Sequence, residues 1–544
     1  MRRSIVVSSL MVLALHASAQ QRSDTTLKST TIEVLQSYKP EVKQAPKPDF
    51  KPDVPPRDTS RPAFKYDVPQ QALSYTYSSL PLRPLALGKD STKLPFQNYL
   101  KLGGGNLSTI CADAGIGYSK ENNYETSLHL HHLSQNGNIK NQKIALSGIE
   151  TEGTLHSGDH ALRLSLEGMR NQYHFYGYNH ALLELGADSV KQTYTGVRAA
   201  FDVKNERVNK LGINYHPKIG IDYYTDANQV SERTLFFDVP FSKNFDTSLT
   251  LSVGVRGAFT TLSGVSREWT NNTFQFTPQL SFQKNGFSGR AGLYPTLSNF
   301  YDLLFLPDIE AAYRFASTQF TISAGWKADL RQNTFRQLTT YNPYLFPLST
   351  HPSFSVRQTR TEEIFGKLST GIGNHFTVSG KLSWWQLKHL PMFLNNTHDR
   401  KNFYLVYDSL VNAISFEASI RYQVANRFSI GATGVYTSFG QKTFSRVWHE
   451  PGMRIKADLM LHPIPDLTIT AYAIVLDQIY ALNELNQEVK LSTALDAGAG
   501  AEYQFIPRLS AFINVNNVFN NRYQRWYGYE TFGINVFGGL RFKF

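Results

Sequence analysis

Cysteine is almost missing from this sequence, which has a single one, Cys111, among 544 residues. One cysteine cannot form an internal disulfide, so the chain is not a small scaffold held together by disulfides. Long apolar runs are missing as well, because no segment beyond the first twenty residues approaches eighteen unbroken apolar residues. A helical inner-membrane protein is therefore excluded.

Motifs of enzymes and of nucleic-acid-binding proteins are also lacking. No glycine-rich loop opens a helix, and no nucleophile motif stands in a strand–turn–helix setting. We therefore predict no catalytic residue, no cofactor-binding residue and no enzymatic activity. The formal net charge of +12 comes without a dense run of lysine and arginine, which argues against a nucleic acid partner.

The first nineteen residues have the pattern of a secretory signal peptide. Two arginines precede an apolar run from Ile5 to Leu15, and small residues follow up to Ala19. The apolar run is too short to span a membrane. We expect cleavage after Ala19 and export of the mature chain.

Residues 20–97 differ in composition from the rest of the chain, because they hold 11 of its 24 prolines. Repeated Lys-Pro and Pro-Asp steps disfavour helix and ladder pairing and favour extended polyproline-type chain. We predict a flexible periplasmic arm that is either a passive spacer or a segment that docks or threads. Its aromatic residues would anchor it against the walls of a lumen, the candidates being Phe64, Tyr66, Tyr75 and Tyr77.

From Asn98 onward, apolar residues alternate with small or polar ones, as in Leu249–Ala258 and Leu467–Val475. Period two is the pattern of β-strands with two different faces. The chain has 29 Tyr and 36 Phe but a mean hydropathy of only −0.32. Many aromatic residues without net hydrophobicity are typical of a barrel whose strands have one wet face.

Very short turns, rich in Asn, Asp, Gly and Pro, join these strands in pairs. Ten such turns use twenty strands, and the first and last strands bring the total to 22. Because outer-membrane barrels place their short turns and both chain ends on the periplasmic side, we predict a 22-stranded antiparallel transmembrane β-barrel over residues 98–544. The fold class is thus all-β, with a Pro-rich N-terminal extension. The ten turns are Lys120–Asn123, His156–Asp159, Asn205–Arg207, Asn244–Asp246, Lys284–Gly286, Ala316–Thr318, Gly373–His375, Ala425–Arg427, Ile464–Asp466 and Ile506–Arg508. The longest extracellular loops are expected within Leu330–Glu363 and Gln386–Phe403.

Alternate residues of the last strand should face lipid, and the residues between them should face the lumen. Asn535, Arg541 and Lys543 are expected to face the lumen. A strand that ends in phenylalanine looks like the C-terminal signal by which the outer-membrane assembly machinery recognises its substrates. That signal would comprise Leu540, Phe542 and Phe544, on the face turned toward outer-membrane lipid.

Three histidines in HLHHL, namely His129, His131 and His132, are the most metal-like cluster in the sequence. His129 and His131 share a strand face and can share a metal, but a third ligand is not visible. We therefore interpret them as polar lumen residues and predict no metal site. The aromatic clusters Trp384-Trp385 and Tyr523–Tyr529 are interpreted as interface girdle or loop.

The segment INVNNVFNNRYQRWYGYETFGINVFGGLRFKF (Ile513–Phe544) resembles the end of TonB-dependent receptors. In that family an Asn-rich step leaves the penultimate strand, a glycine-containing last strand ends in Phe, and the barrel has 22 strands. The segment ASAQ is similar to Bacteroidota export signals. The resemblance implies TonB as a partner through an energy-coupling box, and the box-like residues here are Thr31, Ile32, Glu33, Val34 and Leu35.

The sequence departs from this family where its folded plug would lie, because about 78 Pro-rich residues stand between the signal peptide and the barrel (97 − 19). The first functional hypothesis is an outer-membrane receptor or transporter without a normal plug, for a nutrient too large for porins. The alternative is a plugless barrel that acts as a scaffold or accessory subunit of a larger outer-membrane complex. Either way a wide lumen must be closed, by the arm or by another protein.

Overall fold

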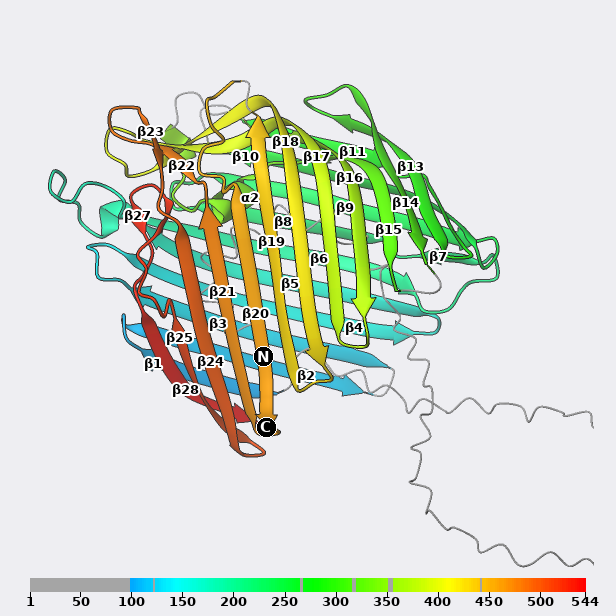
Figure 1. Cartoon of the computed structure of the whole chain (residues 1–544), viewed down its shortest axis with the longest axis horizontal. Helices are drawn as coiled ribbons and strands as arrows, with labels where there is room; N and C mark the ends of the chain where they lie inside the picture. The colour runs from blue at the N-terminus through cyan, green and yellow to red at the C-terminus, as the bar shows by residue number, and fades with distance from the viewer. Residues whose placement is uncertain (1–97, 121–122, 265–267, 316–318, 351–355, 441–442) are drawn as a thin grey trace, which may run out of the picture. The chain divides into compact units, whose positions relative to one another are not determined.

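The computed structural model describes residues 98–120, 123–264, 268–315, 319–350, 356–440 and 443–544. The expected signal peptide and arm lie outside these residues. The described part is almost wholly one antiparallel sheet, with a short helix α2 (Phe335–Tyr341) and two 3-10 turns, η2 (Asp188–Val190) and η3 (Leu348–Thr350) (Figure 1). No helix in it has both the length and the apolar character needed to cross a membrane.

Twenty-four strand segments form the sheet. They are β1 (Tyr99–Gly105), β2 (Thr109–Lys120), β3 (Tyr124–Asn136), β4 (Lys143–Ser157), β5 (His160–His174), β6 (Lys191–Asn205), β7 (Ile213–Tyr215), β8 (Lys218–Asp226), β9 (Ser231–Asn244), β10 (Leu249–Ser263), β11 (Trp269–Phe276), β12 (Gln279–Lys284), β13 (Phe287–Ser298), β14 (Leu303–Arg314), β15 (Thr321–Arg331), β16 (Thr359–Ile372), β17 (Phe376–Asn395), β18 (Phe403–Val424), β19 (Phe428–Gly440), β20 (Met453–Ile464), β21 (Leu467–Asp477), β24 (Ala494–Ile506), β25 (Leu509–Asn516) and β28 (Asn535–Lys543). Two further hairpins lie in loops, β22 (Tyr480–Leu482) with β23 (Glu488–Lys490), and β26 (Gln524–Trp526) with β27 (Tyr529–Glu530).

Two pairs of segments are single strands that a proline interrupts. β7 and β8 both pair with β9 and are separated at Pro217, and β11 and β12 both pair with β10 and β13 and are separated at Pro278. Proline has no backbone N–H to donate to the ladder, so the pairing breaks there. The twenty-four segments are therefore 22 strands, which confirms the predicted number.

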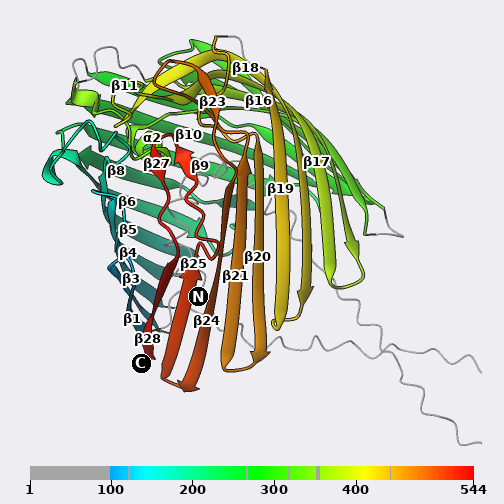
Figure 2. The ribbon, with the colours of Figure 1, turned by 60° about the vertical axis from the view of Figure 1, so that its left-hand side comes forward.

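The sheet closes on itself through its first and last strands. β28 pairs with β25 on one side and with β1 on the other, in a register that runs from Tyr99↔Lys543 to Gly105↔Phe537 (Figure 2). Every other barrel strand pairs with the strands that precede and follow it in the chain. The described strands thus form a closed antiparallel barrel with no free edge, as predicted.

All ten predicted turns fall between consecutive strands, although residues 121–122 of the turn between β2 and β3 and residues 316–318 of the turn between β14 and β15 lie outside the described residues. The β12–β13 turn shows the local chemistry, since Asn285 and Gly286 both have positive φ, 51° and 82°. This is the conformation of the Asn-Gly hairpin. The ten turns share one end of the barrel with Asn98 and Phe544, and we call it the turn end; the opposite end is the loop end.

The predicted loop positions are confirmed in one case and wrong in the other. Residues 332–358 do form a long connection, between β15 and β16. The segment Gln386–Phe403 is mostly strand, because β17 and β18 run for 20 and 22 residues and leave only residues 396–402 between them. Both strands extend beyond their neighbours at the loop end, where their apolar residues pack against other loops rather than lipid.

The predicted facing of the last two strands is confirmed. Leu540 and Phe544 are 55% and 58% exposed on the outer face, whereas Asn535 and Arg541 are buried on the inner face. On β25, Ile513 points outward and is 52% exposed, and its neighbour Asn514 is buried. The sequence periodicity therefore assigns the outer and inner faces correctly.

A charge on the outer face of the closing strand should impair assembly. We expect Leu540→Asp to lose folded barrel, because a charged residue facing lipid is destabilising. The cost is up to roughly 2–4 kcal/mol for lysine or arginine at the membrane midplane and smaller for aspartate. The readout is the heat-modifiable mobility of the barrel in gel electrophoresis. Lys543→Ser, on the inner face, is the matched control, and a tolerant Leu540→Asp beside a damaging Lys543→Ser would show that the assigned facing is wrong.

The turn end should be periplasmic and the loop end extracellular. In a Cys111→Ala background, an impermeant maleimide on intact cells should label Leu485→Cys, a loop-end residue that is 75% exposed. It should leave Asn285→Cys, in a turn, unlabelled. Thr339 lies within the predicted extracellular segment Leu330–Glu363, but it is unsuitable for labelling because only 2% of it is exposed. If only Asn285→Cys were labelled, the turn end would be extracellular and the assigned orientation would be wrong.

Candidate functional site: the loop cap

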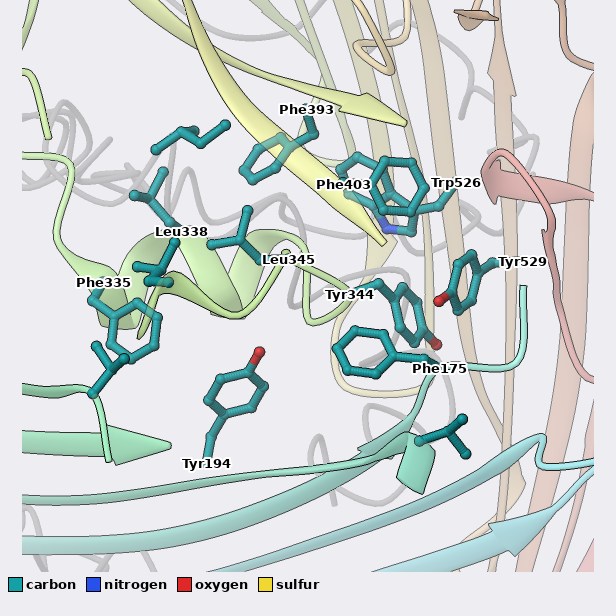
Figure 3. Close-up of a cluster of buried hydrophobic side chains, with 14 of the residues drawn as sticks. Phe175, Tyr194, Phe335, Leu338, Tyr344, Leu345, Phe393, Phe403, Trp526 and Tyr529 are labelled. Carbon is teal, nitrogen blue, oxygen red and sulfur yellow. The ribbon is translucent and has the colours of Figure 1, made fainter. Parts of the chain in front are cut away.

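Connections at the loop end fold together around a shared hydrophobic core, which we call the loop cap. Its main parts are residues 175–190, 332–350, 356–358, 396–402 and 517–534, with α2 at its centre (Figure 3). The buried core residues are Phe175, Tyr176, Tyr178, Val190, Tyr194, Tyr224, Val230, Leu262, Phe335, Leu338, Tyr344, Leu345, Leu348, Val356, Phe393, Phe403, Leu405, Trp526 and Tyr529.

The loop cap reaches across the mouth of the barrel. β5 and β6 are the fifth and sixth strands of the ring, and β17 and β18 are the fifteenth and sixteenth, so these pairs are ten positions apart in a ring of 22. Residues from both sides belong to the same buried core, Phe175 from one and Phe403 from the other. Segments from nearly opposite walls therefore meet over the lumen.

Tyr344 is the point where three of these segments meet. Its ring stacks on Tyr529 at 3.7 Å between centroids and meets the edge of Tyr176 at 5.9 Å. The Tyr529 hydroxyl donates to the carbonyl of Lys401 on a fourth segment. Burial raises the pKa of Tyr344 and of Tyr529 well above the ordinary value, so both hydroxyls stay neutral.

A glycine allows the last loop to come this close. Gly528 turns the β26–β27 hairpin with φ of 86°, a conformation that residues with a side chain rarely adopt. A Cβ atom at this position would also lie 2.6 Å from the carbonyl oxygen of Gly177. The approach of residues 526–529 to residues 175–178 therefore depends on the missing side chain.

Acidic side chains of the barrel wall hold α2 in the mouth. The Arg336 guanidinium donates to Asp222 at 2.8 Å and to Glu167 at 2.5 Å. The Glu232 carboxylate accepts the backbone N–H groups of Phe335 and Arg336 at 2.5 and 3.1 Å. Charge-assisted hydrogen bonds of this kind are about twice as strong as neutral ones. Three strands, β5, β8 and β9, thus anchor one short helix.

A second anchor lies on the opposite side, around the buried Arg525. Its guanidinium donates to the carbonyl of His449 and, at 2.7 Å, to the hydroxyl of Tyr341. His449 donates through Nδ1 to the carbonyl of Phe393 at 2.7 Å. The last loop, the loop before β20, and α2 are therefore joined by one polar network inside the loop cap.

A cavity that is partly open to solvent lies between the loop cap and the barrel wall. Two of its lining residues carry buried polar atoms that have no hydrogen-bond partner among the described residues, Nε of Arg525 and Nε1 of Trp526. Cavities that are mostly apolar with a few polar groups are the usual form of ligand sites. Its other lining residues include Tyr176, Tyr344, Tyr472, Asp496 and Asn516.

The sequence-predicted residues have different outcomes. The box-like Thr31–Leu35 and the arm residues Phe64, Tyr66, Tyr75 and Tyr77 lie outside the described residues. Leu540, Phe542 and Phe544 are on the outer face of the closing strand, away from the loop cap. The structure brings His129 and His131 together on the inner wall, beside a third residue, Glu150.

The two aromatic clusters have different surroundings. Trp384 is 39% exposed on the outer face, as an interface residue would be. Tyr523–Tyr529 lies in the last loop, which confirms the loop interpretation. Trp526 and Tyr529 are buried in the core of the loop cap. The loop cap itself was not predicted, although residues 332–358 carried a signal for it, namely several large apolar side chains in a connection that would otherwise be polar.

Comparison with known proteins identifies the fold. No family model and no curated protein matches the sequence. Among solved structures, the FrpB iron transporter from Neisseria meningitidis (F3-3 variant) has a TM-score of 0.66 at 11% identity, over 83% of this chain and 82% of that one. The ferric-catecholate import receptor Fiu from K12 E. coli has a TM-score of 0.61 at 12% identity, over 82% of each chain.

The pyoverdine outer membrane receptor FpvA from Pseudomonas aeruginosa PAO1 has a TM-score of 0.61 at 11% identity, over 82% of this chain and 78% of that one. By name, these neighbours are an iron transporter, a ferric-catecholate import receptor and an outer membrane receptor for pyoverdine. The barrel expected from the sequence resemblance is thus confirmed as a fold.

The loop cap should loosen in acid. Burial, and then the charge of Arg525, lower the pKa of His449 to about 3, below the unfolded value of about 6.5. The unfolded segment therefore binds the proton first, so this contribution to stability is complete above about pH 6.5 and is lost as the pH falls toward 3. At pH 5 the loss is about 2 kcal/mol.

Hydrogen–deuterium exchange measures this effect directly. Residues 517–534 should exchange faster at pH 5 than at pH 7.5, after correction for the intrinsic rate. His449→Gln can still donate to the carbonyl of Phe393 but cannot take up a proton, and should remove most of the pH dependence. An unchanged pH dependence in that variant would assign the effect to other groups.

Proposed function

We propose that this chain is an outer-membrane receptor or transporter whose own loops close the outer mouth of its barrel. The observation that carries this proposal is the loop cap, in which segments from opposite walls share one core above a lumen of 22 strands. Barrels of this size enclose a lumen that needs to be plugged. A closure built from loops can open when the right solute binds, which is what uptake requires.

The cavity beneath the last loop supports a role in solute recognition. Its aromatic walls suit flat or apolar parts of a solute, and the donors of Arg525 and Trp526 suit acceptor oxygens. The structural neighbours include an iron transporter, a copper transporter and a pyoverdine receptor. We propose, on this basis, a nutrient too large for porins that presents acceptor oxygens, such as a metal chelate.

The proposal includes the N-terminal segment. The box-like residues Thr31–Leu35 would engage TonB, and the Pro-rich arm would serve in place of a normal plug, with Phe64, Tyr66, Tyr75 and Tyr77 as its anchors. In the alternative function, the barrel is an accessory subunit and its arm docks a partner. These two functions differ in whether the loop cap works as a gate, and that difference can be measured.

Conductance in planar bilayers tests the gate. The purified full-length wild type should conduct little, because the loop cap closes the mouth. Arg336→Ala removes the cation that Glu167 and Asp222 share, and leaves Asp222 only the longer contact with Arg198 at 4.0 Å. This loss costs about 1–3 kcal/mol. A shift of that size raises the open population by roughly 5- to 150-fold. The variant should therefore conduct far more often.

Arg421→Ala is the matched control for the gating test. Arg421 also forms an ion pair, with Asp458 at 3.1 Å, but lies near the turn end of β18, far along the strand from the loop cap. The Arg421→Ala variant should conduct like the wild type. A wild type that is already open would refute closure by the loops. If Arg336→Ala also stays closed, something else occludes the pore, and removal of residues 20–97 then tests the arm.

A further inference from the structure

We propose that His129, His131 and Glu150 bind a divalent transition-metal ion on the inner wall of the barrel. Each residue places one ligand atom so that the three atoms lie within 4.8 Å of one another. The residues come from β3 and β4, which are neighbours in the sheet, and His129 pairs directly with Glu150 across the strands (Figure 1). This site does not rest on the proposed function, although Glu150 pairs across β4 and β5 with Glu167, which binds Arg336 of the loop cap.

The strand geometry brings these ligands to one face. His129 and His131 are two residues apart on β3 and point inward, while Leu130 between them is 41% exposed outside. The distance from Nδ1 of His129 to Oε2 of Glu150 is 3.9 Å. Ligands of a tetrahedral Zn²⁺ ion at about 2.1 Å are roughly 3.4 Å apart. A side-chain adjustment of about 1 Å would complete the coordination.

Asp113 and Tyr99 orient His129 for metal binding. Its Nε2 lies 3.1 Å from Oδ2 of Asp113, and the other oxygen of Asp113 accepts a hydrogen bond from the hydroxyl of Tyr99. An ionised carboxylate only accepts hydrogen bonds, so Nε2 carries the proton. In the neutral ring, the lone pair is then on Nδ1, which faces Glu150. Metal-binding histidines usually show this carboxylate–histidine arrangement.

The neighbouring strand β4 makes room for the side chain of His131. Its ring lies over Gly148, and a Cβ atom at that position would come within 2.2 Å of the ring. Gly148 is the residue that pairs with His131 across β3 and β4. The centroids of the two imidazole rings are 5.5 Å apart. The absence of a side chain at residue 148 therefore sets the place of the second ligand next to the first.

The donor set selects the class of ion. Two imidazole nitrogens and one carboxylate oxygen suit Zn²⁺, Cu²⁺ or Ni²⁺, whereas Mg²⁺ and Ca²⁺ prefer oxygen donors. Three protein ligands also leave a coordination position for water or for a further ligand. Glu150 has 42% of its side chain exposed, so an ion can reach the site from the lumen side of the wall.

Metal content after dialysis tests the site. The full-length protein, purified with a tag that contains no histidine, is dialysed against ZnCl₂ and then buffer, and its zinc is measured by mass spectrometry. The wild type should retain one ion per chain, and MgCl₂ should not compete. His131→Ala and Glu150→Gln should each lose the ion. Asp113→Asn should weaken binding by about 10- to 100-fold in calorimetry.

His132→Ala is the matched control, because His132 is on the same strand but bonds to Ser147 instead, at 2.8 Å. It should retain the zinc. Heat-modifiable mobility shows which variants are folded, and the wild type loaded with Cu²⁺ gives a test that needs no variant. Its electron paramagnetic resonance spectrum should show coupling to two nitrogens. Zinc retained by both ligand variants, no stoichiometric ion in the wild type, or a copper spectrum without nitrogen coupling would each overturn the proposal.

Discussion

Closure of the backbone hydrogen bonds between β28 and β1 is the constraint on which the rest of the structure depends. In the hydrocarbon of a membrane no water is present to satisfy a free N–H or C=O group, so a sheet can span it only as a closed ring. Here the register Tyr99↔Lys543 to Gly105↔Phe537 completes that ring. It fixes the first and last strands as neighbours, and with them the facing of every residue between.

A closed ring of 22 strands creates two apolar environments that a polar wall separates. Outer residues such as Leu540 and Ile513 form an exposed apolar face, while inner residues such as Ser510 and Asn514 are polar. The second apolar environment is the loop cap, whose aromatic core forms away from lipid. Loops can build a core of this size only because the barrel holds their ends at fixed places around the mouth.

The inner wall supplies the polar groups that give this arrangement its chemistry. Glu167, Asp222 and Glu232 hold α2 in the mouth. His129, His131 and Glu150 converge on the neighbouring strands β3 and β4, where Glu150 pairs with Glu167. Rigid strands place such groups more accurately than loops do, because each side chain is fixed by its ladder partners. The polar wall therefore both positions the loop cap and offers the proposed metal site.

The sequence by itself determined the barrel. Alternation of apolar and polar residues is a local pattern with period two, and turn residues such as Asn285-Gly286 mark where each pair of strands ends. These local signals were enough for the strand count, the ten turns and the facing of β28. They failed for most of Gln386–Phe403, because His389 and Pro391 indicated a loop, whereas the ladder with β18 continues past both residues to Asn395↔Phe403.

Only the tertiary structure decided what lies inside and above the barrel. Tyr344 meets Tyr529, and Arg336 meets Glu167, across separations of more than 150 residues. Glu150 joins the two histidines because β4 lies beside β3 in a particular register. Neither kind of contact produces a periodic pattern in the sequence. Both depend on which strands become neighbours and on how the ring brings their loops together. That is why the strands could be predicted and the loop cap and the metal site could not.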